Sequence, residues 1–383
     1  MRVTGVKTFL VHPGTGKNWL FAKVETDEGV YGWGEAYTQA DRDKTIEVHI
    51  HAMGRYLVGR SPFHIKHFTQ VMFMDFATRR GSLEFYCALS ALEQALWDIV
   101  GKATGQPVYN LLGGPCRERV RVYANGWYEG ARTPQDFARL AVATVQKGFA
   151  ALKFDPFPPP WRPYISRQEE DEAVETVRAV REAVGPQVDL LIEVHRRLAP
   201  MHAVRVARRL EEFKPFWYEE PVDSENLDAL AEVRRQISLP VVTGEALYSK
   251  WEFRQVFEKR CADIINPDVC NCGGILELKE IAGMAEPHFV VVSPHNYNST
   301  TIGLAATLQV SATIPNFLIT EYFVNFTEVG DAISREPFKV ENGYIRLPDK
   351  PGLGLELDEE SLARYPYKPF PARPIRLYHQ EGP

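Results

Sequence analysis

From about residue 121 to residue 327 the chain alternates short apolar runs with helix-like segments, and this alternation constrains the fold more than any other feature. Strands that alternate with helices imply right-handed crossovers and a parallel sheet. Eight strands in about 200 residues favour a (β/α) barrel over an open doubly wound sheet, and no G-x-G-x-x-G motif follows the first strand. The expected strands are residues 121–124, 151–154, 188–194, 216–220, 241–245, 263–266, 288–293 and 317–321.

The segments on either side of the barrel have different sequence patterns. Residues 3–11, 20–26 and 30–35 alternate like strands of an antiparallel sheet, and residues 83–101 have helical periodicity. We therefore expect an α+β capping domain over residues 1–118, the barrel over residues 119–327, and a Pro-rich irregular segment over residues 328–383 that returns to the cap.

Two loops of the cap are candidates for covering the barrel mouth, residues 12–19 and 73–80. Arg79 and Arg80 in the second loop face either substrate or solvent, with solvent favoured. Trp19 in the first is either an apolar lid or part of the core.

Composition excludes several classes of protein. The net charge of −6 gives no basic surface for nucleic acid or anionic lipid. No apolar run approaches the roughly 20 residues of a membrane span, and the N-terminus enters a strand pattern directly, so we expect a cytoplasmic protein without a signal peptide. An odd, scattered set of cysteines indicates no disulfide framework; they are Cys87, Cys116, Cys261, Cys270 and Cys272.

Ionisable residues stand at the ends of successive predicted strands. They recur every 23 to 27 residues, which is about one strand and one helix. Because the carboxyl ends of barrel strands surround one mouth, these side chains are expected to face a common site. The residues from the third to the eighth strand are Glu193, Glu219, Glu245, Asp268, His295 and Glu321.

Three of these strand ends are glutamates on successive strands, Glu193, Glu219 and Glu245. Converging carboxylates repel one another unless a cation lies between them. Hard oxygen ligands select Mg²⁺ or Mn²⁺ over zinc, and Mg²⁺ keeps coordination positions for water and a substrate carboxylate. We therefore expect Mg²⁺ as cofactor and a small hydroxy-carboxylate as substrate.

At these residues the chain resembles the enolase superfamily, and within it the mandelate racemase subgroup with its acid-sugar dehydratases. The resemblance extends from the Gly-Trp-Gly-Glu segment at 32–35 to the Pro-Gly-Leu-Gly segment at 351–354. It implies a modified TIM barrel of the (β/α)7β type with an α+β cap. It also implies that one carboxylate from each of the third, fourth and fifth strands binds Mg²⁺, which here are Glu193, Glu219 and Glu245.

The resemblance further implies an acid–base pair. Asp268 and His295 match the base of that subgroup, and Glu321 matches a glutamate that lies near the substrate carboxylate. Removal of a proton α to a carboxylate creates an enediolate, whose charge a bound Mg²⁺ stabilises. Asp268 would accept the other ring N–H of His295 and fix its tautomer. Lys153, at the end of the second strand, is placed to add positive charge at the substrate carboxylate.

Two residues depart from the racemases of the subgroup. Those enzymes carry a second Lys two residues after the first, where this chain has Asp155, so two-base 1,1-proton transfer with that Lys is not expected. His195 matches a histidine that assists departure of the 3-hydroxyl in sugar-acid dehydratases. One histidine as base and another as acid give β-elimination of water and a 2-keto-3-deoxy acid. Asp155 could meet a distal substrate hydroxyl or pair with Lys153.

Two further segments bear on the substrate. Residues 123–128 and 151–157 look like those of gluconate or galactonate dehydratases, and Asn125 is a candidate for binding substrate hydroxyls. Residues 195–198 are also similar to mannonate dehydratases, a match that we rank lower. A sugar-acid epimerase or cycloisomerase and an aldarate dehydratase are alternatives, whereas the intact acidic and histidine residues argue against a non-catalytic barrel. The family implies a homo-oligomer, from dimer to octamer, and a small-molecule sugar acid as the binding partner.

Overall fold

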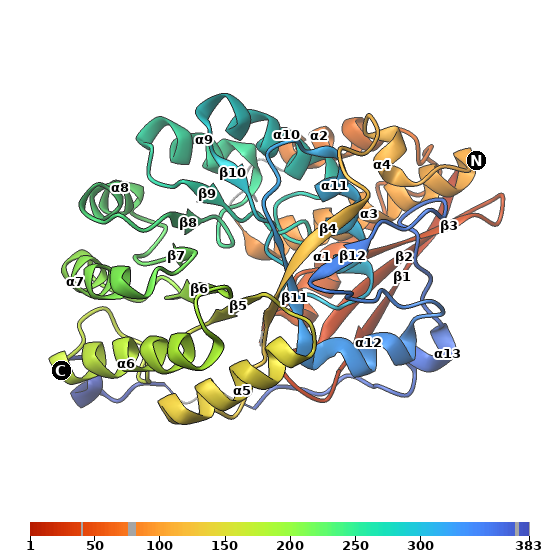
Figure 1. Ribbon diagram of the computed structural model, residues 1–383. Helices are drawn as coiled ribbons and strands as arrows, with labels where there is room; N and C mark the ends of the chain where they lie inside the picture. The colour runs from red at the N-terminus through yellow and green to blue at the C-terminus, as the bar shows by residue number, and fades with distance from the viewer. Residues whose placement is uncertain (40, 76–81, 372–374, 383) are drawn as a thin grey trace.

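The N-terminal part of the protein is a three-stranded antiparallel sheet covered by helices (Figure 1). The structure is a computed structural model that describes residues 1–39, 41–75, 82–371 and 375–382. The three predicted strands are confirmed to within one residue at each end. The elements are β1 (Val3–Val11), β2 (Trp19–Thr26), β3 (Tyr31–Ala36), α1 (Asp43–Gly54), α2 (Ile65–Asp75), α3 (Leu83–Thr104) and α4 (Val108–Leu111).

Helix α3 lies so close to β3 that no side chain fits between their backbones. A Cβ atom at Gly34 would lie 1.8 Å from the carbonyl oxygen of Ala91, and one at Gly32 would lie 2.1 Å from that of Ala95. The two glycines of the Gly-Trp-Gly-Glu segment therefore permit this approach. It carries Glu35, the last residue of the segment, to a buried contact with the barrel, where it accepts a hydrogen bond from the backbone of Ser299.

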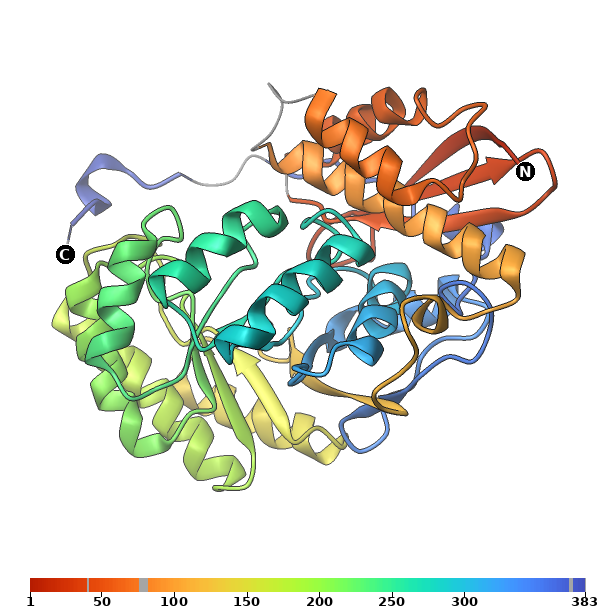
Figure 2. The same ribbon diagram turned by 90° about the horizontal axis from the view of Figure 1, so that it is seen from above.

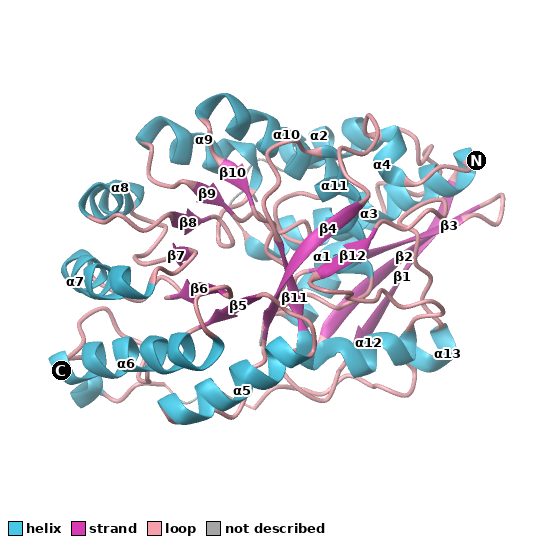
Figure 3. Ribbon diagram, in the orientation of Figure 1, coloured by secondary structure: helices cyan, strands magenta, loops and turns pink. Residues whose placement is uncertain are grey.

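Eight parallel strands form the barrel, as the alternation predicts. Their order is β10-β9-β8-β7-β6-β5-β4-β11, and a bridge between Val292 and Phe317, just before β11, joins the two ends. Figure 3 shows the strands inside and the helices outside. The strands are β4 (Arg119–Asn125), β5 (Ala151–Phe154), β6 (Asp189–Glu193), β7 (Trp217–Glu219), β8 (Val241–Thr243), β9 (Ile264–Ile265), β10 (Val291–Val292) and β11 (Thr320–Phe323).

The seventh barrel strand is shorter than the apolar run predicts. The expected strand at residues 288–293 is reduced to β10, because a 3-10 turn precedes it and Phe289 has a left-handed backbone with φ of 57°. That turn is η3 (Glu286–His288), and similar 3-10 turns are η2 (Glu211–Phe213), η4 (Val324–Phe326) and η5 (Tyr378–Gln380).

Two barrel helices begin at side-chain caps. Thr133 and Ser166 each form a capping box with the residue three positions later, at the start of α5 and α6. Every residue of α11 is buried, because this helix also packs against β3 of the cap. The helices are α5 (Pro134–Gln146), α6 (Arg167–Val184), α7 (Pro200–Leu210), α8 (Leu227–Gln236), α9 (Ser249–Lys259), α10 (Ile275–Ala285) and α11 (Ile302–Thr313).

The C-terminal segment is more regular than the sequence suggested. It contains α12 (Thr327–Ile333), β12 (Tyr344–Arg346) and α13 (Glu359–Leu362), and β12 pairs antiparallel with β4 of the barrel. The segment also contacts the cap, where Lys102 forms an ion pair with Glu356 and the side chain of Asn18 donates to the carbonyl of Lys368. The chain then ends beside the barrel, away from the cap (Figure 2).

Two expectations from composition concern the whole chain. All five cysteines are free, and only Cys116 is exposed, which agrees with the expectation of no disulfide framework. Within the described residues, no helix has both the length and the apolar character that crossing a membrane requires.

Candidate active site

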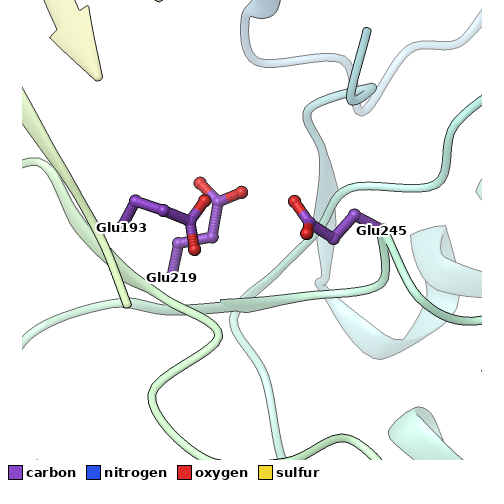
Figure 4. Close-up of side chains that lie close together, drawn as sticks. All are labelled: Glu193, Glu219 and Glu245. Atoms are coloured by element: carbon purple, nitrogen blue, oxygen red, sulfur yellow. The ribbon is translucent and has the colours of Figure 1, made fainter. Parts of the chain in front are cut away.

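Three carboxylates meet at the mouth of the barrel. Glu193 ends β6, Glu219 ends β7, and Glu245 follows β8 by two residues. Because neighbouring parallel strands end at the same level, their side chains converge (Figure 4). One oxygen atom from each of the three lies within 4.8 Å of the others.

Glu193 and Glu219 each have one oxygen held by the protein and one left over. Oε1 of Glu193 accepts from the next two backbone N–H groups at 3.0 and 2.7 Å. Oε1 of Glu219 accepts from Lys153 Nζ at 2.7 Å and from Asn266 Nδ2 at 2.8 Å. The Oε2 atoms of both are buried and accept no hydrogen bond in the described structure, and that of Glu193 lies 3.1 Å from the Lys153 amine as an ion pair. Burial and the charge of Glu193 raise the pKa of Glu219 well above its usual value.

Glu245 completes the group of three, and the protein again holds one of its two oxygens. Its Oε1 accepts from Arg196 Nη1 at 2.5 Å, and its Oε2 lies 3.4 Å from Nε2 of His295. Burial alone would raise the pKa of Glu245, but Arg196 and His295 outweigh it and hold that pKa well below the usual range.

Buried oxygens without donors are costly unless something fills the space that they face. Three hard carboxylate oxygens around one point are suited to a divalent cation. The residues present therefore fit such an ion, and Glu193, Glu219 and Glu245 could hold it.

Lys153 lies among the acidic groups of the mouth rather than on the surface. Its Nζ is 2.7 Å from Glu219, 3.1 Å from Glu193 and 3.2 Å from Glu321. Burial would lower the pKa of Lys153, but the surrounding carboxylates raise it well above the usual value, which keeps the amine charged. Lys153 is therefore a fixed positive charge between the group of three and Glu321.

His295 and Asp268 form a buried pair. The bridge between their backbones continues the pairing of β9 and β10 and sets them side by side, and Nδ1 of His295 lies 2.7 Å from Oδ2 of Asp268. Nε2 therefore points at the mouth, where it is 3.5 Å from Glu321. Burial lowers the pKa of His295, but the charges of Glu321 and Glu245 outweigh burial and raise that pKa.

His195 has a carboxylate partner of its own. Its Nδ1 lies 2.7 Å from Oδ2 of Asp155, on the neighbouring strand end. We expected Asp155 to meet a distal substrate hydroxyl or to pair with Lys153. The structure places its carboxylate on His195 and Arg197 and places Lys153 on other carboxylates, so the pairing with Lys153 is not seen, while contact with a substrate hydroxyl stays a prediction.

Asn125 lies next to Glu321 at the end of β4. Its Nδ2 donates to Glu321 at 2.7 Å, and its Oδ1 accepts from the backbone N–H of Gly126. In the structure its amide holds Glu321, and the expectation that Asn125 binds substrate hydroxyls stays a prediction.

The cap reaches the site through the residues after β3. The ring of Tyr37 lies 6.0 Å from that of His295, and the buried amine of Lys17 is 3.8 Å above the Tyr37 ring. Burial lowers the pKa of Lys17 to about 8. Trp19 is fully buried and packs edge-on against Phe326, so it belongs to the core and not to a lid. Arg79 and Arg80 lie outside the described residues.

Sequence reasoning gave no role to three residues that hold the others in place. Arg196 holds Glu245, Asn266 holds Glu219, and Asn298 donates to both oxygens of Asp268 at 2.9 Å. Asn266 was detectable, since it stands at a strand end two residues before Asp268. Arg196 and Asn298 lie in loops, where strand periodicity gives no signal.

The fold and this geometry agree with comparisons to known proteins. A family model described as enolase C-terminal domain-like matches residues 136–361, and the mandelate racemase and muconate lactonizing enzyme N-terminal domain matches residues 11–113. The chain belongs to the enolase superfamily, in its mandelate racemase subgroup. The recognition made from strand ends is thereby confirmed, as is the barrel with its N-terminal domain.

Relatives in this superfamily match the chain over nearly its full length. A D-galactonate dehydratase of Variovorax paradoxus is 36% identical and covers 100% of this chain and 99% of its own. A D-gluconate dehydratase of Thermoproteus tenax is 37% identical and covers 91% of this chain and 70% of its own. The crystal structure of a mandelate racemase/muconate lactonizing enzyme from Sulfitobacter sp. has a TM-score of 0.90 at 32% identity, with 96% of each chain covered.

Proposed function

We propose that this protein is a Mg²⁺-dependent dehydratase that converts an aldonate such as gluconate or galactonate into a 2-keto-3-deoxy acid. The observation that carries the proposal is the pair of histidines around the three carboxylates. His195 follows β6 and His295 follows β10, four strands apart in a circle of eight, and each has Nδ1 on its own carboxylate. Relatives named D-galactonate and D-gluconate dehydratases support this reading.

Glu193, Glu219 and Glu245 would hold the metal through the oxygens that face one another. Mg²⁺ bound there would supply positive charge at the substrate carboxylate and so favour loss of the α-proton. Lys153 adds a second positive charge at the same place. Carboxylate oxygens and the need for open coordination positions favour Mg²⁺ over zinc.

The two histidines divide the proton transfers. Nε2 of His295 takes the proton from C2, while Asp268 keeps the ring in the tautomer that leaves Nε2 free. His195 gives a proton to the 3-hydroxyl, which leaves as water when the C3–O bond breaks. The resulting enol tautomerises to the 2-keto acid. Over one turnover His295 gains one proton and His195 loses one. Exchange with solvent then returns both rings to their starting protonation states.

An epimerase through the same enediolate is the second candidate, because a histidine facing His295 could also return a proton to C2 from the other side. Product analysis separates the two. We expect D-gluconate, D-galactonate or another aldonate, screened with aldarates in Mg²⁺, to give a keto acid that reacts with semicarbazide. Conversion to an isomeric sugar acid without keto acid would favour the epimerase.

Two variants test the roles of the histidines. His295→Asn should abolish exchange of the α-proton with solvent, whereas His195→Asn should abolish elimination and keep some exchange. Undiminished exchange in the first variant would remove His295 as the base. Unchanged turnover in the second would remove His195 as the acid.

A further inference from the structure

Asp155 stands directly after β5, and the protein holds both of its oxygens. Oδ1 accepts from the backbone N–H of Phe157 at 3.0 Å, and Oδ2 accepts from Nδ1 of His195 at 2.7 Å and from the guanidinium of Arg197. The carboxylate is therefore fixed from two sides, and its remaining task is to hold the His195 ring.

Arg197 is itself immobile, which makes the anchor rigid. Its Nε donates to the carbonyl of Val194 at 3.0 Å and its Nη1 to that of Phe157 at 3.2 Å, and the residue is buried. The guanidinium also lies 4.4 Å from the ring of Trp161. A guanidinium in this position holds the neighbouring carboxylate in place.

Trp161 completes the support from another direction. Its ring centroid is 5.3 Å from that of His195, at an interplanar angle of 44°. His195 is thus held at one ring edge by Asp155 and packed against an aromatic ring. Its backbone has φ of 54°, and φ is 63° at Arg196, which is an uncommon left-handed conformation for residues other than glycine.

The proposed base, His295, is held by a carboxylate in the same way as His195. In both pairs Nδ1 faces a carboxylate oxygen at 2.7 Å, which leaves Nε2 for the site. In the described structure, no hydrogen bond engages Nε2 of His195. We propose that Asp155 is a positioning residue for His195, so that the site contains two carboxylate–histidine pairs, one for each proton transfer. The inference rests on the proposed function, since it concerns the proton donor of the same reaction.

The test compares Asp155→Asn with wild type, with D-galactonate and D-gluconate as substrates and Mg²⁺ present. Keto-acid formation is measured with semicarbazide, and deuterium uptake at C2 of recovered substrate is measured by NMR in D₂O. We expect elimination to fall about 10- to 100-fold, as for other partners that orient a histidine, while exchange persists. The ratio of exchange to elimination should therefore rise at least tenfold, with little change in KM.

Asp189→Asn is the matched control. Asp189 also pairs with an arginine, Arg121 at 2.6 Å, but stands at the opposite end of barrel strand β6. This variant should leave the ratio unchanged. If exchange and elimination fall together in Asp155→Asn, or if neither falls, the inference is wrong. If His195→Asn eliminates water normally, the proposed acid is wrong, and that result is distinct from a failure of Asp155 alone.

Two further measurements distinguish the inferred role of Asp155 from misfolding of the variant and from an incorrect choice of substrate. Trp161 is half exposed, so Trp161→Ala should fold and shift the ratio in the same direction by a smaller factor. Independently of turnover, long-range ¹H–¹⁵N spectra assigned with His195→Asn, at a pH where the ring is neutral, should show His195 protonated at Nδ1 in wild type and a mixture of tautomers in Asp155→Asn. A wild-type ring protonated only at Nε2 would overturn the inference.

Discussion

Three carboxylates are buried where the cap meets the barrel and the C-terminal segment, and three more form the group at the barrel mouth, but the two sets are held in different ways. At the contact, Glu93 accepts from Trp97 and from two backbone N–H groups at the start of α10, at 2.7 to 2.9 Å. Both oxygens of each acid there have donors in the protein, as expected for buried charge. These acids are Glu35, Glu93 and Asp98.

In the group of three at the mouth, by contrast, the protein donates hydrogen bonds to one oxygen of each acid, and the other oxygen faces the shared centre, near Lys153 in Glu193 and near His295 in Glu245. Glu193 and Glu219 each bury such an oxygen. Burial of a carboxylate is therefore no evidence of function by itself in this protein. What indicates a metal site is a buried carboxylate oxygen that the fold orients without supplying a hydrogen-bond donor to it.

The largest effect should come from removing one of the open oxygens. Glu219→Gln should weaken Mg²⁺ binding more than about 100-fold and abolish keto-acid formation, because it removes a ligand charge from the group of three. The thermal midpoint should change little, since the substitution also removes repulsion between neighbouring carboxylates. Isothermal titration with Mg²⁺ and a thermal melt measure both quantities. Unchanged Mg²⁺ affinity would contradict the assignment of the metal site.

A smaller effect is expected from the donor that holds the other oxygen of Glu219. Asn266→Ala should weaken Mg²⁺ binding about 10- to 100-fold, because the ligand loses the contact that orients it. Asn316→Ala is the control, since Asn316 donates only to backbone carbonyls of Ala282 and Val290, at the far end of β10. Equal losses of affinity in the two variants would show a general packing effect.

The acids of the cap contact should affect stability and not metal binding. Glu93→Gln should leave Mg²⁺ affinity unchanged and lower the free energy of unfolding by about 1 to 2 kcal/mol, because one backbone N–H at the start of α10 loses its acceptor. Urea unfolding with Mg²⁺ titration measures the two effects together. A loss of Mg²⁺ affinity in this variant would erase the distinction between the two regions.

The same residue predicts a pH dependence. Burial raises the pKa of Glu93 to about 7, whereas an unfolded glutamate titrates near about 4.3. The folded state therefore binds more protons between these values, and the stability contributed by Glu93 is lost as pH rises through about 7. We expect the wild-type unfolding free energy to fall more steeply over this window than that of Glu93→Gln. Identical pH slopes in the two proteins would contradict the assignment of this pH dependence to Glu93.

Much of the site was predictable because it is periodic. Glu193, Glu219 and His295 recur in phase with the barrel strands, and that phase alone placed them at one mouth. The partners of these residues are not periodic. Asn298 and Arg196 reach the site from loops, and Asp155 pairs with a residue 40 positions away, which requires knowing how two strand ends lie in space.

Two elements of the fold were mispredicted or missed for similar reasons. An apolar run such as residues 288–293 fits a strand, and its pattern cannot reveal that Phe289 turns into the left-handed region. The strand β12 was missed because three residues in a Pro-rich segment give too short a pattern, and its partner β4 lies more than 200 residues earlier.

The late position of the C-terminal segment has a consequence for synthesis on the ribosome. Asp98 of the cap receives its hydrogen bond from Leu353, and Asn18 receives its contact from Lys368. These groups of the cap therefore acquire their partners only after the barrel between them has been translated. During that interval Asp98 and Asn18 lack these hydrogen bonds, so the nascent chain passes through a stage in which aggregation competes with folding.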